Sequence, residues 1–136
     1  MKQYTSPNFF NLVVPDNWEY KDEDSIVTLY NSQNGLGAIQ ISKFSIPTNY
    51  KMNLVNELSE FVSEKFKNLN KQELIKNIKE RKNLSLVEVR VDQRYWVFYI
   101  IFKNAKLLFV SYNCNIEDEN KEIPVVYEVI DSINLL

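Results

Sequence analysis

The chain has 136 residues, a formal net charge of −2, 45% hydrophobic residues and 25% charged residues, which is the composition of an ordinary folded protein and excludes a wholly disordered chain. It contains no histidine, which excludes Ser-His-Asp triads, histidine zinc sites and imidazole acid–base catalysis. A single cysteine excludes an internal disulfide and a cysteine metal cluster, and only two glycines leave no phosphate-binding loop.

The N-terminal third predicts an antiparallel meander. Residues 9–14 are largely apolar and are stopped by Pro15, which has no N–H for a sheet ladder, so they predict a first strand. Residues 15–17 predict a turn that leads to Trp18, and residues 22–24 predict a solvated acidic turn. Two further strands are expected over 26–30 and 37–44, joined by a polar hairpin that contains Gly35.

The apolar spacing then changes to that of a helix. Apolar residues from Leu54 to Leu69 recur every three or four positions, so we expect a helix over about 54–68 with Asn53 as its N-cap. Residues 71–82 fit either a short helix or a charged edge strand. The chain ends in a second predicted helix, over about 124–134, in which Pro124 lies in the first turn, where no intrahelical N–H is needed.

Three strands are predicted between these helices, over 86–92, 94–103 and 107–112. The first alternates apolar and charged residues, whereas the strand over 94–103 is apolar on both sides, with Trp96 and Phe98 on one face and Tyr95 and Tyr99 on the other. Both faces of that strand must therefore be covered. Two helices on the same face would expose one of these rows or require a dimer.

These elements predict one domain over residues 1–136 of the α+β class. We expect a mostly antiparallel six-stranded sheet with helices on both faces, in the order β-β-β-α-β-β-β-α. Trp96 is predicted to lie in the core, so its replacement by alanine is expected to cost about 3–5 kcal/mol of stability.

Residues 10–18, with the sequence Phe-Asn-Leu-Val-Val-Pro-Asp-Asn-Trp, resemble the start of the PsbP-like superfamily. The resemblance continues through the strand that bears Trp96, through Ser111-Tyr112 and through residues 130–133, so that it spans residues 8–134. It implies an antiparallel sheet between helices. The better known members, photosystem extrinsic subunits and a Ran-binding import factor, act by binding other proteins. No catalytic signature and no manganese or Ran site transfers to residues of this chain.

The groups with potential for catalysis or metal binding have simpler structural explanations. Cys114 has no histidine to activate it and fits a small apolar residue at a strand end. The acidic runs 22–24 and 117–119 lack the glycine bend of a calcium loop, and they fit a solvated turn and the start of a helix. We therefore expect no catalytic residue, no metal and no cofactor.

The charge distribution suggests an interface. Residues 65–106 carry 11 basic and 4 acidic residues, a net +7, while the segments before and after carry −4 and −5. The candidate interface residues are Lys79, Arg81, Lys82, Arg90, Arg94 and Tyr95. The pI of 5.2 opposes nucleic-acid binding, and the acidic ends of the folded chain could neutralise this stripe.

The sequence thus favours a non-catalytic protein-interaction module, for example an immunity-type or accessory protein. Its first residues lack a signal peptide and no apolar run approaches the roughly 18 residues of a membrane span, so a bacterial cytoplasmic location without membrane contact is expected. The alternative is a small-ligand or lipid-binding domain with a pocket between the sheet and a helix. The hypothesis of an enzyme that uses carboxylates or Cys114 has the least support. The partner and the oligomeric state stay open.

Overall fold

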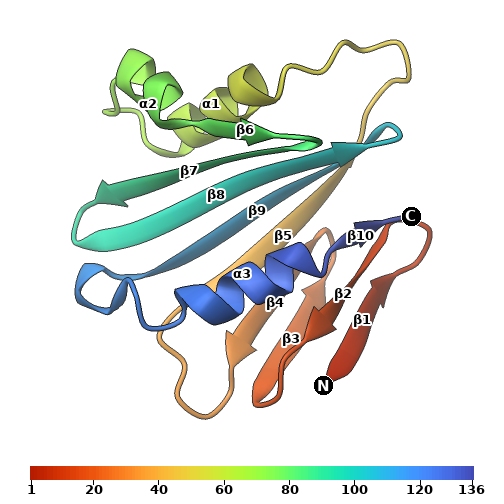
Figure 1. Cartoon of the computed structure of the whole chain (residues 1–136), viewed down its shortest axis with the longest axis vertical. Helices are drawn as coiled ribbons and strands as arrows, with labels where there is room; N and C mark the ends of the chain where they lie inside the picture. The colour runs from red at the N-terminus through yellow and green to blue at the C-terminus, as the bar shows by residue number, and fades with distance from the viewer.

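The computed structural model describes all residues from 1 to 136 (Figure 1). The helices are α1 (Leu54–Lys65), α2 (Lys71–Asn77) and α3 (Ile123–Asp131), with a 3-10 turn η1 (Ile116–Asp118) before α3. The strands are β1 (Lys2–Ser6), β2 (Phe10–Val14), β3 (Trp18–Glu23), β4 (Ile26–Asn31), β5 (Ala38–Ser45), β6 (Lys79–Arg81), β7 (Leu84–Val91), β8 (Arg94–Lys103), β9 (Lys106–Asn115) and β10 (Asn134–Leu135). The α+β class predicted from the sequence is confirmed.

Two antiparallel sheets are present where one was predicted. The main sheet has seven strands in the order β3-β4-β5-β9-β8-β7-β6, and the second has three in the order β1-β2-β10. The predicted six-stranded count is therefore wrong. The predicted first strand is β2, which pairs with the two ends of the chain instead of joining the meander of the main sheet.

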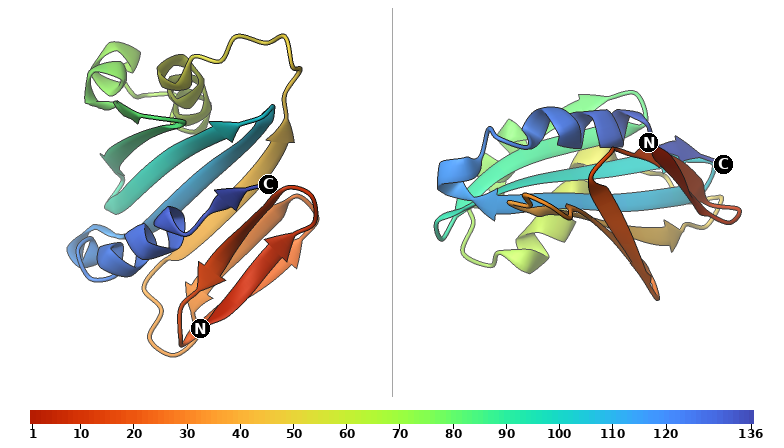
Figure 2. Two further views of the ribbon diagram at one scale, coloured as in Figure 1. Left: turned by 45° about the vertical axis from the view of Figure 1, so that its right-hand side comes forward. Right: turned by 90° about the horizontal axis from the view of Figure 1, so that it is seen from below.

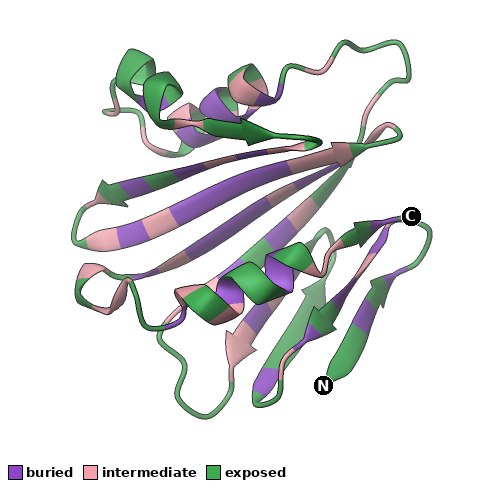
Figure 3. Ribbon diagram, in the orientation of Figure 1, coloured by how far each residue is buried: buried purple, intermediate pink, exposed green.

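The main sheet is covered on both faces, as its two-sided apolar strand requires. Figure 2 shows α3 on one side of the main sheet and α1 and α2 on the other. On the α1 side, Phe98 and Ile100 of β8 pack with Leu58 and Val62 of α1. The opposite face packs against α3 and the three-stranded sheet. Figure 3 shows that burial is greatest along β8 and β9, and the predicted covering of both faces is confirmed.

Helix α1 begins where it was predicted and ends earlier. The Asn53 side chain accepts a hydrogen bond from the Asn56 N–H at 3.1 Å, which satisfies one of the unpaired donors of the first turn. The helix ends at Lys65 because Phe66 is extended and turns its ring toward Trp96 and Phe98 of the sheet. A second capping side chain, Asn70, then starts α2.

Both alternatives left open for residues 71–82 occur. The first half forms α2 and the second half forms β6, a three-residue strand at the edge of the main sheet. All three residues of β6 are exposed, whereas Leu74 of α2 is buried against the sheet. This edge is important below because β6 carries two of the candidate interface residues.

The last predicted helix is shorter than expected because its end forms a strand. The Ser132 hydroxyl donates to the Val129 carbonyl at 2.6 Å and accepts from the Val13 N–H at 2.9 Å, which fixes the end of α3 against β2. Asn134 and Leu135 then pair with β2 as β10. The C-terminal residues thus close the second sheet.

Strand β3 was not predicted. Apart from Trp18, which is buried, its side chains are exposed, so the segment lacks the alternating pattern that reveals a half-buried strand. The acidic run predicted as a turn lies mostly on this strand, and Asp22 accepts a hydrogen bond from the Tyr4 hydroxyl.

None of the three helices has the length and apolar composition needed to cross a lipid bilayer.

Candidate functional site

A groove with a volume of about 310 Å³ lies between α3 and the β6–β7 edge of the main sheet. Its floor consists of Leu84 and Leu86 from β7 and Tyr99 from β8. Tyr127 and Ile130 of α3 form the opposite wall, and the Tyr127 ring is 40% exposed. The groove therefore offers an apolar surface with an aromatic side chain at its rim.

Four charged side chains line this groove. Lys79 and Arg81 come from β6, Glu88 comes from β7 and Asp131 comes from α3. Because side chains alternate along a strand, Lys79 and Arg81 point to the same face of the sheet, where the pairing register places them opposite Leu86 and Leu84. Lys79, Arg81 and Asp131 form no ion pair, and Glu88 accepts a hydrogen bond from Tyr95 on the adjacent strand.

Tyr99, a residue that is otherwise buried, contributes a solvent-accessible hydroxyl to the groove. The residue is 4% exposed, yet its hydroxyl has no hydrogen-bond partner within the protein, unlike those of Tyr95 and Tyr112. Burial raises the pKa of Tyr99 most; Tyr127, Asp131 and Glu88 raise it further, and Arg81 lowers it. These four neighbours all line the groove with Tyr99, so its hydroxyl lies among the groove's polar groups and is free to bond a ligand or water.

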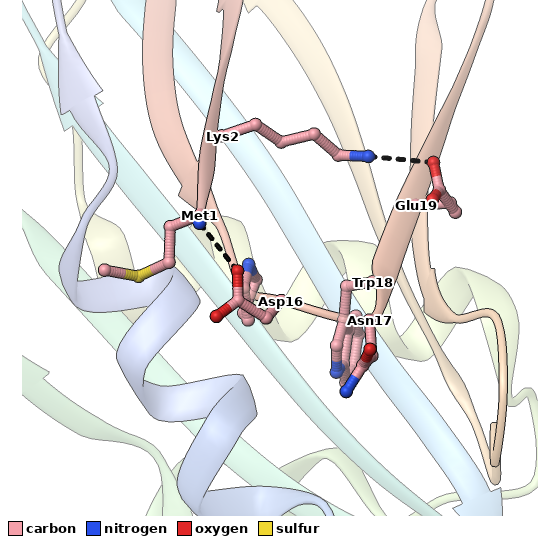
Figure 4. A pocket seen from close by; sticks show the side chains of 7 residues that line it. Met1, Lys2, Asp16, Asn17, Trp18 and Glu19 are labelled. Carbon is pink, nitrogen blue, oxygen red and sulfur yellow. Dashed lines mark hydrogen bonds and ion pairs between the residues drawn. The ribbon is translucent and has the colours of Figure 1, made fainter.

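A second hollow lies near the N-terminus, with a volume of about 250 Å³ (Figure 4). Its charged groups are paired with each other: the Met1 amino group contacts Asp16 at 2.6 Å, and Lys2 contacts Glu19 at 2.8 Å. These pairs leave the hollow few free charges with which to recognise a ligand. The groove beside α3 is therefore the better candidate site.

The thiol of Cys114 is poorly placed to act as a nucleophile. Cys114 is fully buried in β9, and burial raises the pKa of its thiol, an effect that Tyr112 and Arg94 only partly oppose. A thiol with a raised pKa is a weak nucleophile at neutral pH. Nowhere does the chain gather three side chains that could hold a metal ion.

Comparison with solved structures identifies the fold. The solution structure of the cyanobacterial PsbP protein (CyanoP) from Synechocystis sp. PCC 6803 superposes with a TM-score of 0.70 at 10% identity, covering 99% of this chain and 92% of that one. The Ran-binding protein Mog1p from Saccharomyces cerevisiae gives a TM-score of 0.62 at 12% identity, covering 98% and 94% of the two chains. The chain has the PsbP-like fold.

A crystal structure from Bacteroides thetaiotaomicron VPI-5482 shares this PsbP-like fold with a TM-score of 0.65 at 15% identity. The alignment covers 99% of this chain and 48% of that one, so the chain spans about half the length of the Bacteroides protein. Neither a protein-family model nor a curated protein sequence matches the chain. At these identities the likeness establishes the fold, which the sequence resemblance had implied.

The PsbP-like fold brings together three of the six candidate interface residues. Lys79 and Arg81 line the groove, and Lys82 is exposed in the turn that follows β6. The other three are not gathered there: Arg90 pairs with Glu119, Arg94 bonds the side chains of Asn113 and Asn115, and Tyr95 is 1% exposed. Tyr95 is thus a core residue, and its predicted role as a surface aromatic is corrected.

The ion pair between Arg90 and Glu119 joins the basic block to the acidic C-terminal segment, and its contribution to stability can be tested. The guanidinium donates to both carboxylate oxygens and holds the pKa of Glu119 below its ordinary value of 4.5. A depressed folded-state pKa stabilises the protein above the unfolded pKa, and this stability is lost as the pH falls through the folded pKa. We expect Glu119→Gln to be less stable than the wild type at pH 7 and this difference to shrink below pH 4.5, measured by denaturant unfolding. A difference that stays constant from pH 7 to the acid limit would contradict it.

Sequence reasoning missed Tyr99, Tyr127 and Asp131. Tyr99 belongs to a strand that is apolar on both sides, and it was assigned to the core with its neighbours. No signal in the sequence singles out Tyr99, because the other groove residues come from β6, β7 and α3. The two α3 residues join the site only through the tertiary fold.

Proposed function

We propose that this chain is a non-catalytic protein-interaction module, of immunity or accessory type in the bacterial cytosol. Its contact surface is the β6 cation strip, which we define as Lys79, Arg81 and Lys82. The partner presents an acidic surface to this strip. A single buried thiol, Cys114, is compatible with the cytosolic setting.

The observation that carries the proposal is the state of the basic residues in the fold. Three cations of the basic block are neutralised, because Lys71 pairs with Glu60, Lys76 with Glu73 and Arg90 with Glu119. Lys79 and Arg81 of β6 and Lys82 in the turn after it are exposed and form no ion pair, and Glu80, between the first two, points to the opposite face of the strand. Three unpaired cations against one carboxylate give this edge a net positive charge, which attracts a partner of the opposite sign.

The same strip limits how the partner can bind. Short edge strands rich in lysine resist the addition of a further strand from another chain. β6 has three residues, two of them basic, so it fits this protective pattern. The partner is therefore expected to contact the side chains of the strip instead of extending the main sheet.

Two further observations support the proposal. Mog1p, which has the same fold, is described as a Ran-binding protein, so the PsbP-like fold can serve protein recognition. Within this chain, the buried Cys114 and the missing histidine leave few groups for acid–base or nucleophilic catalysis. A binding role makes no demand on such groups.

Charge reversal tests the proposal. Immobilised Lys79→Glu/Lys82→Glu protein is compared with wild type and with the control Lys51→Glu/Lys67→Glu in capture experiments from source-cell lysate. Both double variants shift the net charge from −2 to −6, and all four lysines are exposed, so only the position of the change differs. We expect a protein that wild type and control retain at least about tenfold better than the strip variant, a ratio equal to 1.4 kcal/mol of binding free energy.

Two outcomes would count against the proposal. A partner retained equally by all three proteins would remove the β6 cation strip as its binding surface. If no protein is retained reproducibly, the interaction role itself loses its support.

A second candidate function is a small-ligand site in the groove. It is favoured by the Tyr99 hydroxyl, which is accessible in the groove and has no hydrogen-bond partner within the protein. The lipid-binding form of this alternative is disfavoured, because four charged residues line a groove of only about 310 Å³.

A further inference from the structure

The groove beside α3 combines charges of both signs in one small space. Lys79 and Arg81 stand on its β6 side, while Asp131 belongs to α3 and Glu88 to β7. A simple anion would be attracted by the two cations and repelled by the two acids, and a simple cation would meet the reverse. Only a ligand that carries both charges matches the whole arrangement.

The floor of the groove separates these charges with apolar side chains. Lys79 pairs across the strands with Leu86, which in turn lies opposite Tyr99, so the three form one row. With neighbouring strands about 4.8 Å apart, roughly 10 Å separates the backbones at the two ends of this row. Leu84 lies on the same face, opposite Arg81. An apolar group of the ligand can therefore rest on Leu84 and Leu86 beneath the Tyr127 ring.

Tyr99 supplies the hydrogen bond that fixes the ligand. Its hydroxyl is unpartnered although the residue is 96% buried, since 4% of its surface is exposed. A tyrosine hydroxyl is protonated at neutral pH, and burial raises its pKa further, so Tyr99 can donate to a ligand oxygen. Arg81 lines the same groove as Tyr99 and Tyr127, so its guanidinium can contact the ligand there.

The size of the groove limits the ligand. Small-molecule sites commonly have volumes of roughly 300–1,000 Å³, and about 310 Å³ is at the lower end of that range. Such a space suits one amino-acid-sized molecule better than a peptide or an acyl chain.

We propose that this groove binds a small zwitterion with an apolar side chain, of the class of free apolar α-amino acids. The ligand carboxylate meets Arg81, Lys79 and the Tyr99 hydroxyl, its ammonium group meets Asp131 and Glu88, and its side chain covers Leu84 and Leu86. The inference rests on the second candidate function, and its site shares Lys79 and Arg81 with the β6 cation strip.

The test is a titration of the full 15N-labelled chain with L-phenylalanine and L-leucine, followed by amide chemical shifts. We expect shifts confined to residues 79–88, 99 and 127–131. N-acetyl-L-phenylalanine lacks the ammonium charge and L-phenylalaninamide lacks the carboxylate, so each is expected to bind about tenfold more weakly than phenylalanine, as the loss of one charge-assisted hydrogen bond implies.

Variants separate charge recognition from simple apolar contact. Tyr99→Phe removes only the hydroxyl and is expected to weaken phenylalanine binding about fivefold. Arg81→Gln should remove most of the preference for phenylalanine over phenylalaninamide and leave the preference over N-acetylphenylalanine intact. Lys21→Gln, a change of the same kind on β3 at the opposite edge of the main sheet, should alter neither.

The proposal is overturned if neither amino acid shifts the groove amides in the millimolar range. It is also overturned if both blocked analogues bind as tightly as phenylalanine, because the groove would then not recognise the charges of the ligand. Equal phenylalanine affinities of Tyr99→Phe and Lys21→Gln would overturn it as well. The capture experiment measures protein retention by the Lys79→Glu/Lys82→Glu variant, whereas the titration measures amino-acid binding. Each experiment can therefore fail without deciding the outcome of the other.

Discussion

Replacing Glu122 by alanine is expected to lower the free energy of unfolding by about 3–5 kcal/mol, because buried donors left without an acceptor cost about 1–3 kcal/mol each. Glu122 is 7% exposed and its carboxylate accepts three hydrogen bonds. The donors are the Tyr112 hydroxyl at 2.7 Å, the Gly37 N–H at 3.0 Å and the Leu36 N–H at 3.3 Å. This one side chain therefore ties the β4–β5 loop and β9 to the start of α3.

The loop reaches Glu122 only because residue 37 is glycine. A Cβ atom at Gly37 would lie 2.1 Å from the Asn113 carbonyl oxygen, a distance that no side chain tolerates, so the backbone can approach β9 this closely only without one. Denaturant unfolding of Glu122→Ala should be compared with Glu122→Gln, which keeps one acceptor oxygen and is expected to lose about half as much.

Glu128→Ala is the matched control, since Glu128 is exposed on the same helix and its removal should change stability by less than about 0.5 kcal/mol. If Glu122→Ala and Glu128→Ala cost the same, the carboxylate does not join the three segments as the contacts indicate.

The parts of the fold that the sequence predicts well are those in which burial sets a clear period. The strand over 94–103 has apolar residues on both faces. It forms β8, whose side chains enter the core cluster on each face of the main sheet. The helix with Leu58 and Val62 on its inner side appears as α1. In both cases the pattern follows directly from which side chains leave water.

Strands with little burial were missed. β3 is an edge strand whose side chains after Trp18 are exposed, and its charged sequence resembles a turn. β10 has two residues and exists only because β2 supplies a pairing partner from the other end of the chain. Neither leaves a periodic signal, because β3 buries no side chain after Trp18 and β10 depends on a strand distant in the sequence.

The candidate site shows the same limit. Lys79 and Arg81 could be selected from charge alone, whereas Tyr99 and Asp131 come from β8 and α3 and meet them only in the folded protein. Tyr95 was selected as a surface aromatic although it belongs to a strand predicted to be covered on both faces. The strand periodicity was the better guide, since Tyr95 is 1% exposed.

Replacing Phe98 by alanine is expected to cost about 3–5 kcal/mol, the usual range for removing a fully buried phenylalanine. Phe98 has no exposed surface and lies at the centre of the α1 side. Its ring stacks on Trp96 at 5.4 Å and on Phe109 at 5.8 Å, and it meets the edge of Phe66 at 6.0 Å. Removal leaves a cavity that these large rings cannot fill without losing their own contacts.

Trp96→Ala is expected to cost less, about 2 kcal/mol, because Trp96 is only half-buried and truncation at the margin of a cluster opens space that water can enter. Its indole lies 4.9 Å from the Lys65 ammonium group, a polar neighbour that marks the edge of the packed layer. The sequence periodicity alone predicts that Trp96 is fully buried, with a loss of about 3–5 kcal/mol on its replacement by alanine. Denaturant unfolding of both variants gives the order of the two losses in free energy of unfolding. A larger loss for Trp96→Ala than for Phe98→Ala would contradict the expectation and indicate that the α1-side core is centred on Trp96. The expected order places that centre under α1, where Leu58 and Val62 cover Phe98 and exclude water.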